Sequence, residues 1–219
     1  MTKIPIYFMP GLATGPEIFE HLDLSSEIYN FFYLKWKEPL SLEESLENYT
    51  KRMCEDILHK NPVLIGVSFG GIIMQEISKL IDTKKVIIIS SVKTKNELPL
   101  TYKVLIKSKL YKLFPTKTVS NFENYSVFFI GKSLKKKAET YKKYFSVRDE
   151  NYIKWSIHAV LHWQQENVLA GITHIHGTKD AVFPITNIKN VIEIEGGTHA
   201  MILTKSKKIS NIIHQTLTC

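Results

Sequence analysis

The chain contains a serine framed by two glycines, Gly66-x-Ser68-x-Gly70, where an apolar segment gives way to a different pattern. The residues before Ser68 are almost all apolar, as in a buried parallel strand, and the apolar residues after it recur at roughly helical spacing. A sharp turn from strand to helix strains the central residue and leaves almost no room for side chains at the flanking positions. Such a turn would hold the serine hydroxyl at the carboxyl edge of a sheet, facing the positive end of a helix, which is typical of a nucleophile. The alternative is a glycine-rich turn with an inert serine.

Strand-like and helix-like segments alternate along the chain, which indicates an α/β fold with a mainly parallel sheet of about six strands and helices on both faces. In such sheets, sites form at the carboxyl ends of the strands. Ser41, followed three residues later by Glu44, has the spacing of a capping box that opens the second helix. The predicted strands are Ile4–Met9, Asn30–Trp36, Val63–Ser68, Lys85–Ser90, Ile172–His176 and Asn190–Glu195, and the predicted helices are Pro16–Leu22, Leu42–Leu58, Phe69–Ile81 and Ala200–Thr216.

The composition is that of an ordinary soluble globular domain, with 219 residues of which 44% are hydrophobic and 23% charged. No apolar run approaches the roughly 20 residues that a membrane span requires. The apolar start of the chain is interpreted as a strand and not as a signal peptide. The two cysteines, Cys54 and Cys219, give no disulfide framework, so the sequence predicts a cytoplasmic protein.

One segment interrupts the alternation and has a mostly helical pattern. We therefore predict an α/β core formed by residues 1–92 and 168–219, with a basic helical insertion at residues 93–167. Between Lys93 and Arg148, 14 basic residues stand against 3 acidic ones, whereas the whole chain has a net charge of +8, so the excess charge belongs to the insertion. It forms either a solvated lysine face or a docking surface for an acidic partner. Nucleic acid is not expected, because the lysines lack an interleaved pattern of arginine and aromatic residues.

Three motifs together resemble those of the α/β-hydrolase family, and the resemblance covers nearly the whole chain. The first is the nucleophile elbow around Ser68. The second, His176–Pro184, is similar to the family's acid loop, and the third, Gly196-Gly197-Thr198-His199, is similar to the segment that presents the base before the last helix. The order Ser68, Asp180, His199 is the family's order of nucleophile, acid and base. The resemblance implies a short form of the family, because the leading strands of the family's larger sheet have no counterpart here.

The resemblance implies that these three residues form a catalytic triad. A serine hydroxyl is a poor nucleophile until a base takes its proton, which would be the role of His199. Asp180 would hold the imidazole in the correct tautomer and stabilise its charged form without itself taking the proton. The alternatives are a loop histidine that caps a turn and an aspartate that stabilises a turn.

The resemblance also implies an oxyanion hole made of two backbone N–H groups. One belongs to Phe69, which follows the nucleophile, and the other to Leu12, in the loop after the first strand. Many family members have His-Gly where this chain has Pro10-Gly11. Proline has no N–H, but its position is not the expected donor. The alternative for this loop is a tight Pro-Gly turn without a catalytic part.

The insertion follows the fourth predicted strand, where members of this family carry a helical cap that forms the roof of the acyl pocket. We expect Trp155, His158 and Phe183 to contribute to this substrate pocket. His158 and His162 are four residues apart, a spacing that can bind a metal. The sequence offers no third ligand, so neither a metal nor a cofactor is expected.

The sequence therefore predicts a serine hydrolase that cleaves a carboxylic ester by an acyl-enzyme mechanism, with a small-molecule acyl ester or thioester as substrate. One alternative is an acyl thioesterase, or an esterase for acyl groups on a carrier protein, whose basic cap docks the acidic carrier; Pro10-Gly11 resembles thioesterase-type members and favours this reading. Another alternative is a non-enzymatic binder or sensor of a small ligand on the same scaffold. Epoxide or haloalkane opening is not expected, because those members have Asp where this chain has Ser68.

Overall fold

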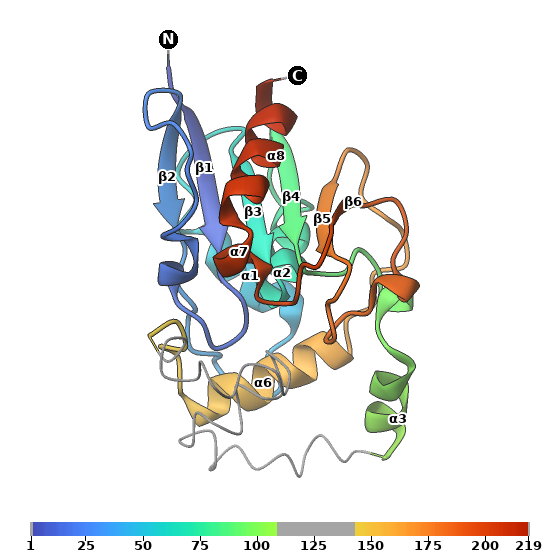
Figure 1. Cartoon of the computed structure of the whole chain (residues 1–219). Coiled ribbons are helices and arrows are strands. Elements are labelled where there is room, and N and C mark those ends of the chain that lie inside the picture. Colours follow the sequence, from blue (N-terminus) through green and yellow to red (C-terminus); the bar gives the residue numbers. More distant parts are fainter. Residues whose placement is uncertain (1, 109–142, 219) are drawn as a thin grey trace.

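A computed structural model of the protein describes residues 2–108 and 143–218, which form one sheet covered by helices (Figure 1). The sheet has six strands in the order β2-β1-β3-β4-β5-β6, and every neighbouring pair is parallel. This confirms the predicted α/β fold with a parallel sheet of six strands. The strands are β1 (Ile4–Met9), β2 (Tyr29–Tyr33), β3 (Val63–Val67), β4 (Lys85–Ile89), β5 (Thr173–Gly177) and β6 (Ile192–Ile194).

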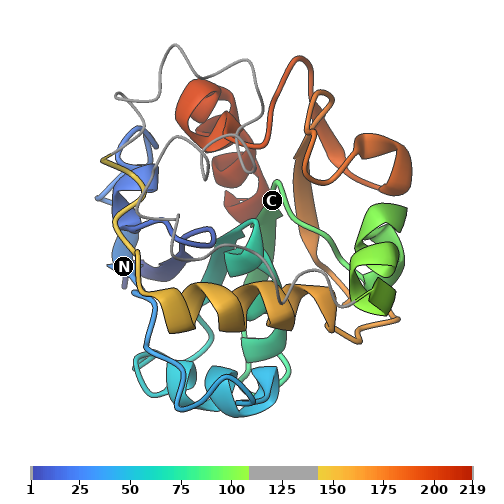
Figure 2. The same cartoon turned by 90° about the horizontal axis from the view of Figure 1, so that it is seen from below.

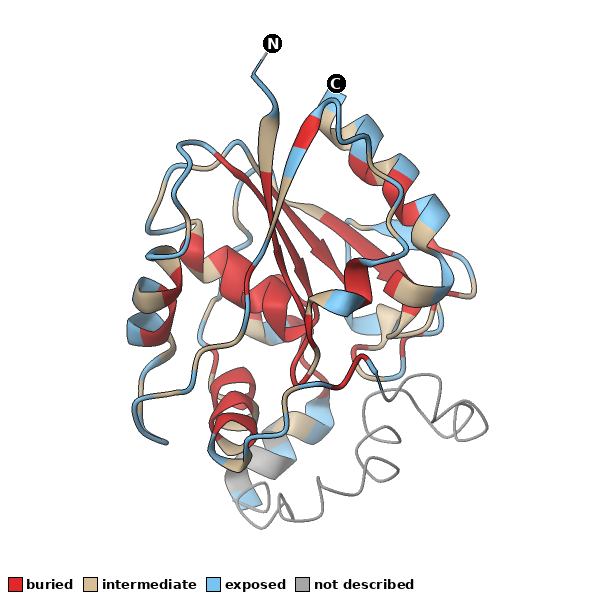
Figure 3. Cartoon of the chain, turned by 90° about the vertical axis from the view of Figure 1, so that its left-hand side faces the viewer, coloured by how far each residue is buried: buried red, intermediate tan, exposed pale blue. Residues whose placement is uncertain are grey.

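Helices cover both faces of the sheet. On one face, α2 (Phe69–Ile77) packs on β3 and β4 with α1 (Leu46–Cys54) beside it. On the opposite face lie α7 (Met201–Thr204) and α8 (Ser206–Thr218), as Figures 1 and 2 show. Because β3 is covered on both sides it is buried along its whole length (Figure 3), which explains why its sequence is a continuous apolar run.

Two helices of the predicted insertion lie at the carboxyl ends of the strands. α6 (Glu150–Leu161) crosses this edge and contacts α3 (Leu100–Ser108), as seen in Figures 1 and 2. Residues 109–142 of the predicted cap lie outside the described residues, so the proposed division into core and cap stays a prediction. Among the helices that are described, none combines the length and the apolar character needed to cross a membrane.

The predicted capping box at the start of the second helix is wrong. α1 begins after Ser45, whose hydroxyl accepts a hydrogen bond from the Asn48 N–H at 3.1 Å. The Glu44 carboxylate is held instead by the Arg52 guanidinium, through two N–H groups at 2.9 and 2.8 Å. The same carboxylate accepts a hydrogen bond from the backbone N–H of Leu40 at 2.7 Å and not from that of Ser41, and the helix starts one turn later than predicted.

Other element boundaries also differ from the prediction. β2 ends at Tyr33, which leaves Trp36 in the loop that follows. The predicted final helix is two helices, because the backbone of Lys205 is not helical. The predicted first helix is only a short 3-10 turn, one of three described: η1 (Pro16–Phe19), η2 (Lys95–Glu97) and η6 (Ile185–Asn187).

Lys93 does not belong to the solvated or docking surface in which the charge pattern placed it. Its side chain is buried at 4% exposure and donates to the carbonyl oxygens of Lys189 and Asn190. The carboxylate of Glu97 lies 3.4 Å from its ammonium group. A buried ammonium group requires such partners, and here they fasten the segment after β4 to the loop before β6.

We expect Ser45→Ala to lower the free energy of unfolding by about 1 kcal/mol, because it removes the hydroxyl that caps α1. The measurement is thermal or denaturant unfolding followed by circular dichroism. Ser41→Ala is the matched control and should change stability by less than about 0.5 kcal/mol. Equal losses in the two variants would contradict the observed start of α1.

Candidate active site

Ser68 lies between the last residue of β3 and the first residue of α2, with φ 54° and ψ −122°. For a residue with a side chain, this left-handed conformation costs about 1–3 kcal/mol. The flanking glycines are required by contact: a Cβ at Gly66 would lie 2.3 Å from the carbonyl oxygen of Gly70, and a Cβ at Gly70 would lie 2.3 Å from that of Pro10. The close approach of β3, α2 and the loop after β1 therefore fixes this turn and presents the serine at the carboxyl edge of the sheet.

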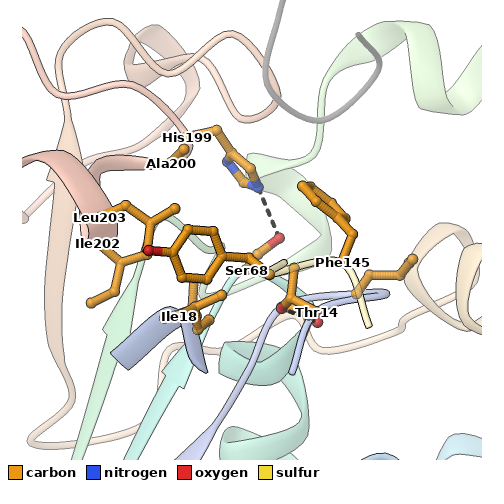
Figure 4. A pocket seen from close by; sticks show the side chains of 12 residues that line it. Thr14, Ile18, Ser68, Phe145, His199, Ala200, Ile202 and Leu203 are labelled. Carbon is orange, nitrogen blue, oxygen red and sulfur yellow. Dashed lines mark hydrogen bonds between the residues drawn. The ribbon is translucent and has the colours of Figure 1, made fainter. Parts of the chain in front are cut away.

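The structure brings Ser68, His199 and Asp180 together in one chain of hydrogen bonds. His199 lies in the turn between β6 and α7, and its Nε2 is 2.9 Å from the Ser68 hydroxyl oxygen (Figure 4). Its Nδ1 is 2.8 Å from Oδ2 of Asp180, in the loop after β5. Because the carboxylate of Asp180 only accepts, Nδ1 carries a proton in this arrangement. The Nε2 of a neutral imidazole is then free to accept the proton of the serine hydroxyl.

The Asp180 side chain is completely buried, yet it is held as a carboxylate. Burial by itself raises the pKa of Asp180, but the charge and hydrogen bond of His199 and the backbone N–H of Phe183 outweigh burial, and the pKa lies below its ordinary value of 3.8. The Oδ1 atom accepts from the N–H groups of Val182 at 2.9 Å and Phe183 at 3.0 Å. A buried negative charge fixed beside the imidazole is suited to stabilise an imidazolium that forms during proton transfer.

Solved structures share this architecture over nearly the whole chain. A carboxylesterase structure from the archaeon Nitrososphaera gargenis is 15% identical with a TM-score of 0.71, covering 99% of this chain and 90% of that one. A bromoperoxidase from Bacillus anthracis is 16% identical with a TM-score of 0.71 (100% and 93% covered), and an epoxide hydrolase from Bacillus megaterium is 14% identical with a TM-score of 0.66 (100% and 94% covered). The chain has the α/β-hydrolase fold.

The α/β-hydrolase fold does not by itself decide the reaction, since these three proteins are described by three different activities. No protein-family model matches the sequence, and no curated protein is similar to it in sequence. The chemistry of this α/β-hydrolase-fold protein therefore depends on the residues of its own site.

Two backbone N–H groups beside Ser68 are free to bind an anion. They belong to Phe69, the first residue of α2, and to Leu12, in the loop after β1. Among the described residues neither N–H has a hydrogen-bond partner, although Phe69 is 1% and Leu12 6% exposed. Buried N–H groups are rarely left unpaired. Leu12 lines the cavity that contains Ser68, and Phe69 directly follows the serine, which are the positions expected of the two donors of an oxyanion hole.

An apolar cavity opens beside the Ser68 hydroxyl, with a volume of about 60 Å³. It lies between the loop after β1 and α7 (Figure 4). Apart from the serine, the histidine and the backbone of the loop, its walls are mostly side chains of Thr14, Ile18, Phe145, Ala200, Ile202 and Leu203. Sequence reasoning missed these residues, although Ile18 follows the predicted oxyanion loop closely and Ile202 and Leu203 follow His199.

The three residues expected in the pocket are not among those that line this cavity. Trp155 is buried in the core. Its indole N–H donates to the carbonyl of Glu44 at 2.8 Å, and its ring packs against the tilted ring of Tyr49. His158 stacks on His162 with ring centroids 4.0 Å apart. In the described part of the chain, no three His, Cys, Asp or Glu side chains gather as metal ligands.

Phe183 contributes to the site by a different contact. Its ring meets the ring of His199 edge-on, with centroids 5.5 Å apart. Its carbonyl oxygen accepts a hydrogen bond from Nε2 of His176 at 2.8 Å, and Nδ1 of His176 faces Nε2 of His174 at 3.1 Å. Burial lowers the pKa of His176 and lowers that of His174 far below 6.5, which favours the neutral form of both imidazoles beside the acid loop. His174 and His176 are two residues apart in a predicted strand, and this spacing is the sequence signal that they lie on the same face of the sheet.

We expect the contribution of Asp180 to the free energy of unfolding to vary with pH. Because its pKa is lower in the folded protein, the carboxylate contributes stability above the unfolded pKa of about 3.9, and this contribution is lost as pH falls through the folded pKa. Asp180→Asn should therefore cost about 2 kcal/mol at pH 6 and progressively less below pH 4. Denaturant unfolding at a series of pH values measures the difference from wild type.

Asp82→Asn, at an exposed position, is the control and should stay within about 0.5 kcal/mol of wild type at every pH. A cost of Asp180→Asn that does not shrink in acid would show that the carboxylate charge does not stabilise the fold.

Proposed function

We propose that this protein is a serine hydrolase that cleaves carboxylic esters through an acyl-enzyme formed on Ser68. The observation that carries the proposal is the chain of hydrogen bonds from the Ser68 hydroxyl through His199 to the buried carboxylate of Asp180. The Ser68 end of this chain lies at an apolar cavity. The N–H groups of Leu12 and Phe69 have no partner among the described residues. A merely structural serine would not need a strained backbone, a histidine and a buried acid arranged in this order.

In the first half of the reaction, the Ser68 oxygen attacks the ester carbonyl while Nε2 of His199 takes the serine proton. The carbonyl oxygen becomes an oxyanion, which the N–H groups of Leu12 and Phe69 stabilise. The tetrahedral intermediate collapses, the bond to the alkoxy oxygen breaks, and the imidazolium returns its proton to the departing alcohol. Asp180 remains ionised throughout and stabilises the charged imidazole.

In the second half, water takes the place of the alcohol. His199 removes a proton from the water, whose oxygen attacks the acyl carbon of the acyl-enzyme. The second tetrahedral intermediate expels the Ser68 oxygen, which recovers its proton from His199, and the carboxylic acid leaves. The cycle consumes one water and needs no oxidant, reductant or cofactor.

The cavity favours a short, apolar acyl group. A water molecule needs roughly 10–15 Å³ of such a cavity, so a volume of about 60 Å³ has room for several waters and fits a short acyl chain better than a long one. The apolar walls give a hydrocarbon chain its binding energy, and no Lys, Arg, Asp or Glu is among the described residues that line the cavity. We therefore place esters of short unbranched carboxylic acids first among the substrates.

A thioester is the second candidate leaving group, because the same acyl-enzyme forms from either substrate. Docking of an acidic acyl carrier would depend on the lysines of the predicted cap, eight of which lie in residues 109–142, outside the described structure. Comparing an acyl-coenzyme A with a p-nitrophenyl ester of the same acid separates the two. Charge-based docking requires that turnover of the coenzyme A substrate falls steeply with salt while turnover of the neutral ester does not.

We expect Ser68→Ala to reduce the hydrolysis of p-nitrophenyl butyrate by at least about 10³-fold without loss of folded structure, because it removes the attacking oxygen. Ser78→Ala, at the other end of α2, is the matched control and should keep wild-type turnover. The measurement is initial rates together with thermal unfolding of both variants.

Undiminished turnover in Ser68→Ala would exclude the acyl-enzyme. Tight binding of an ester without any hydrolysis by the wild-type protein would favour the non-enzymatic binder.

We expect Ile202→Ala to move the acyl-chain preference toward longer chains, because it deepens the cavity at its apolar wall. The ratio of kcat/KM for the octanoyl ester to that for the butyryl ester should rise about 10-fold. Ile213→Ala removes an equally buried isoleucine from α8, outside the cavity lining, and should leave the ratio unchanged. A wild-type protein that prefers the octanoyl ester would contradict the short-chain assignment.

A further inference from the structure

The carbonyl oxygen of Gly11, in the loop after β1, accepts three hydrogen bonds. The backbone N–H of Thr14 donates at 3.0 Å and its hydroxyl at 2.7 Å. The third donor is the indole N–H of Trp36, at 3.0 Å, from the loop after β2. The turn that starts at Gly11 has Ala13 as its third residue, with φ 62°, as in a type II turn. Since alanine is strained in this conformation, outside contacts are needed to keep the turn in place.

The direction of this carbonyl fixes the direction of the Leu12 N–H. Both groups belong to one peptide unit, and the peptide bonds of the described residues are all trans. In a planar trans peptide, the C=O and the N–H point in opposite directions. Trp36 therefore holds the carbonyl on one side of the turn and so directs the Leu12 N–H to the other. Leu12 lines the cavity next to Ser68, where an acceptor for this N–H would bind.

The same indole ring also contacts the second N–H-bearing residue. It lies flat on the ring of Phe69, with centroids 5.1 Å apart and planes inclined by only 8°. The Phe69 side chain is buried at the start of α2, so the stacked rings restrain the segment that directly follows the serine. Trp36 thus joins the two halves of the oxyanion hole, one through a hydrogen bond and the other through ring stacking.

Trp36 is itself held by buried groups. The hydroxyl of Tyr49, on α1, accepts a hydrogen bond from the Lys37 N–H at 3.0 Å and donates one to the Lys37 carbonyl at 2.9 Å. This double contact fixes the backbone next to the tryptophan. The ring of Tyr152, on α6, packs against the indole with centroids 5.2 Å apart. Together with Gly11 and with Phe69 on α2, these contacts to α1 and α6 limit the positions that the indole can take.

We propose that Trp36 is a positioning residue that sets both N–H groups of the oxyanion hole before the substrate binds. The inference rests on the proposed function, because an oxyanion forms only if Ser68 attacks a carbonyl carbon. Donors fixed in advance stabilise charge that develops in the transition state. Loss of their fixation therefore lowers kcat and leaves ground-state binding almost unchanged.

The Trp36→Phe variant tests the proposal, because phenylalanine keeps a ring for the stack on Phe69 and removes the N–H that binds Gly11. We expect kcat for p-nitrophenyl butyrate to fall about 10-fold, less than the ~10²–10³-fold loss when an oxyanion donor is removed outright. The KM should stay within about 2-fold. Butylboronic acid, which forms an anionic tetrahedral adduct with an activated serine, should lose affinity by the same factor as kcat.

Trp163→Phe is the matched control. The Trp163 indole N–H also donates a hydrogen bond, to the Glu76 carboxylate at 2.7 Å, but Trp163 does not line the cavity. Its kcat, KM and boronate affinity should equal those of the wild type. If Trp36→Phe does not fold, Thr14→Val removes another donor to the same carbonyl with little change of shape, and the same loss of kcat and boronate affinity is expected.

An unchanged kcat and boronate affinity in the folded variant would overturn the proposal. So would a change confined to KM or to thermal stability, which is what a purely structural tryptophan would produce. A wild-type protein that neither hydrolyses the ester nor binds the boronate would contradict the proposed function itself. The two failures are thus distinguished by the wild-type result.

Discussion

The left-handed backbone of Ser68 exists only because three segments touch without side chains between them. Gly66 and Gly70 are in contact across the turn, and Gly70 also packs against the carbonyl oxygen of Pro10. The carbonyl of Ser68 is held by the Ser91 hydroxyl at 2.7 Å and its N–H donates to Ile89 at 2.9 Å. These contacts offset the strain and fix the backbone that carries the hydroxyl. The contact with Pro10 also places the Leu12 loop beside the serine, so a single close approach sets both the hydroxyl and the neighbouring N–H groups.

A second contact between two glycines holds the loop of Asp180 against the turn of His199. A Cβ at Gly177 would lie 2.3 Å from the carbonyl oxygen of Gly197, and the N–H of Lys179 donates to that carbonyl at 2.8 Å. The loop that carries Asp180 is therefore bound directly to the turn that carries His199. Since β5 and β6 are parallel neighbours, their carboxyl ends meet at the same edge of the sheet as the end of β3. The hydrogen bonds between the three side chains thus follow from backbone contacts that are made independently of them.

The sequence was sufficient for the parts of the structure that depend on local pattern. The apolar runs predicted all six strands, and the Ser68 turn is recognisable because the contact between Gly66 and Gly70 is made within four residues of the chain. The start of α1 was not predicted, because Arg52 competes for the Glu44 carboxylate and only the folded chain brings the two together.

The walls of the cavity were also not predictable, because they come from segments far apart in the chain. Ile18, Phe145 and Ile202 meet only after folding. The helical pattern predicts Trp155 in the pocket, because a helix has the same apolar face whether it packs on a core or on a ligand. The loop tryptophan Trp36 shows no motif at all, and its part in the site is visible only from its hydrogen bond to Gly11 and its stack on Phe69.

The most direct test of this account is the reaction of the purified protein with a fluorophosphonate probe, read by intact mass and peptide mapping. An activated serine forms a stable adduct with this probe, whereas an ordinary serine does not react at a measurable rate. The account predicts one adduct per chain, located on Ser68, and none after denaturation. The absence of an adduct on the folded protein, or an adduct on another serine, would contradict it.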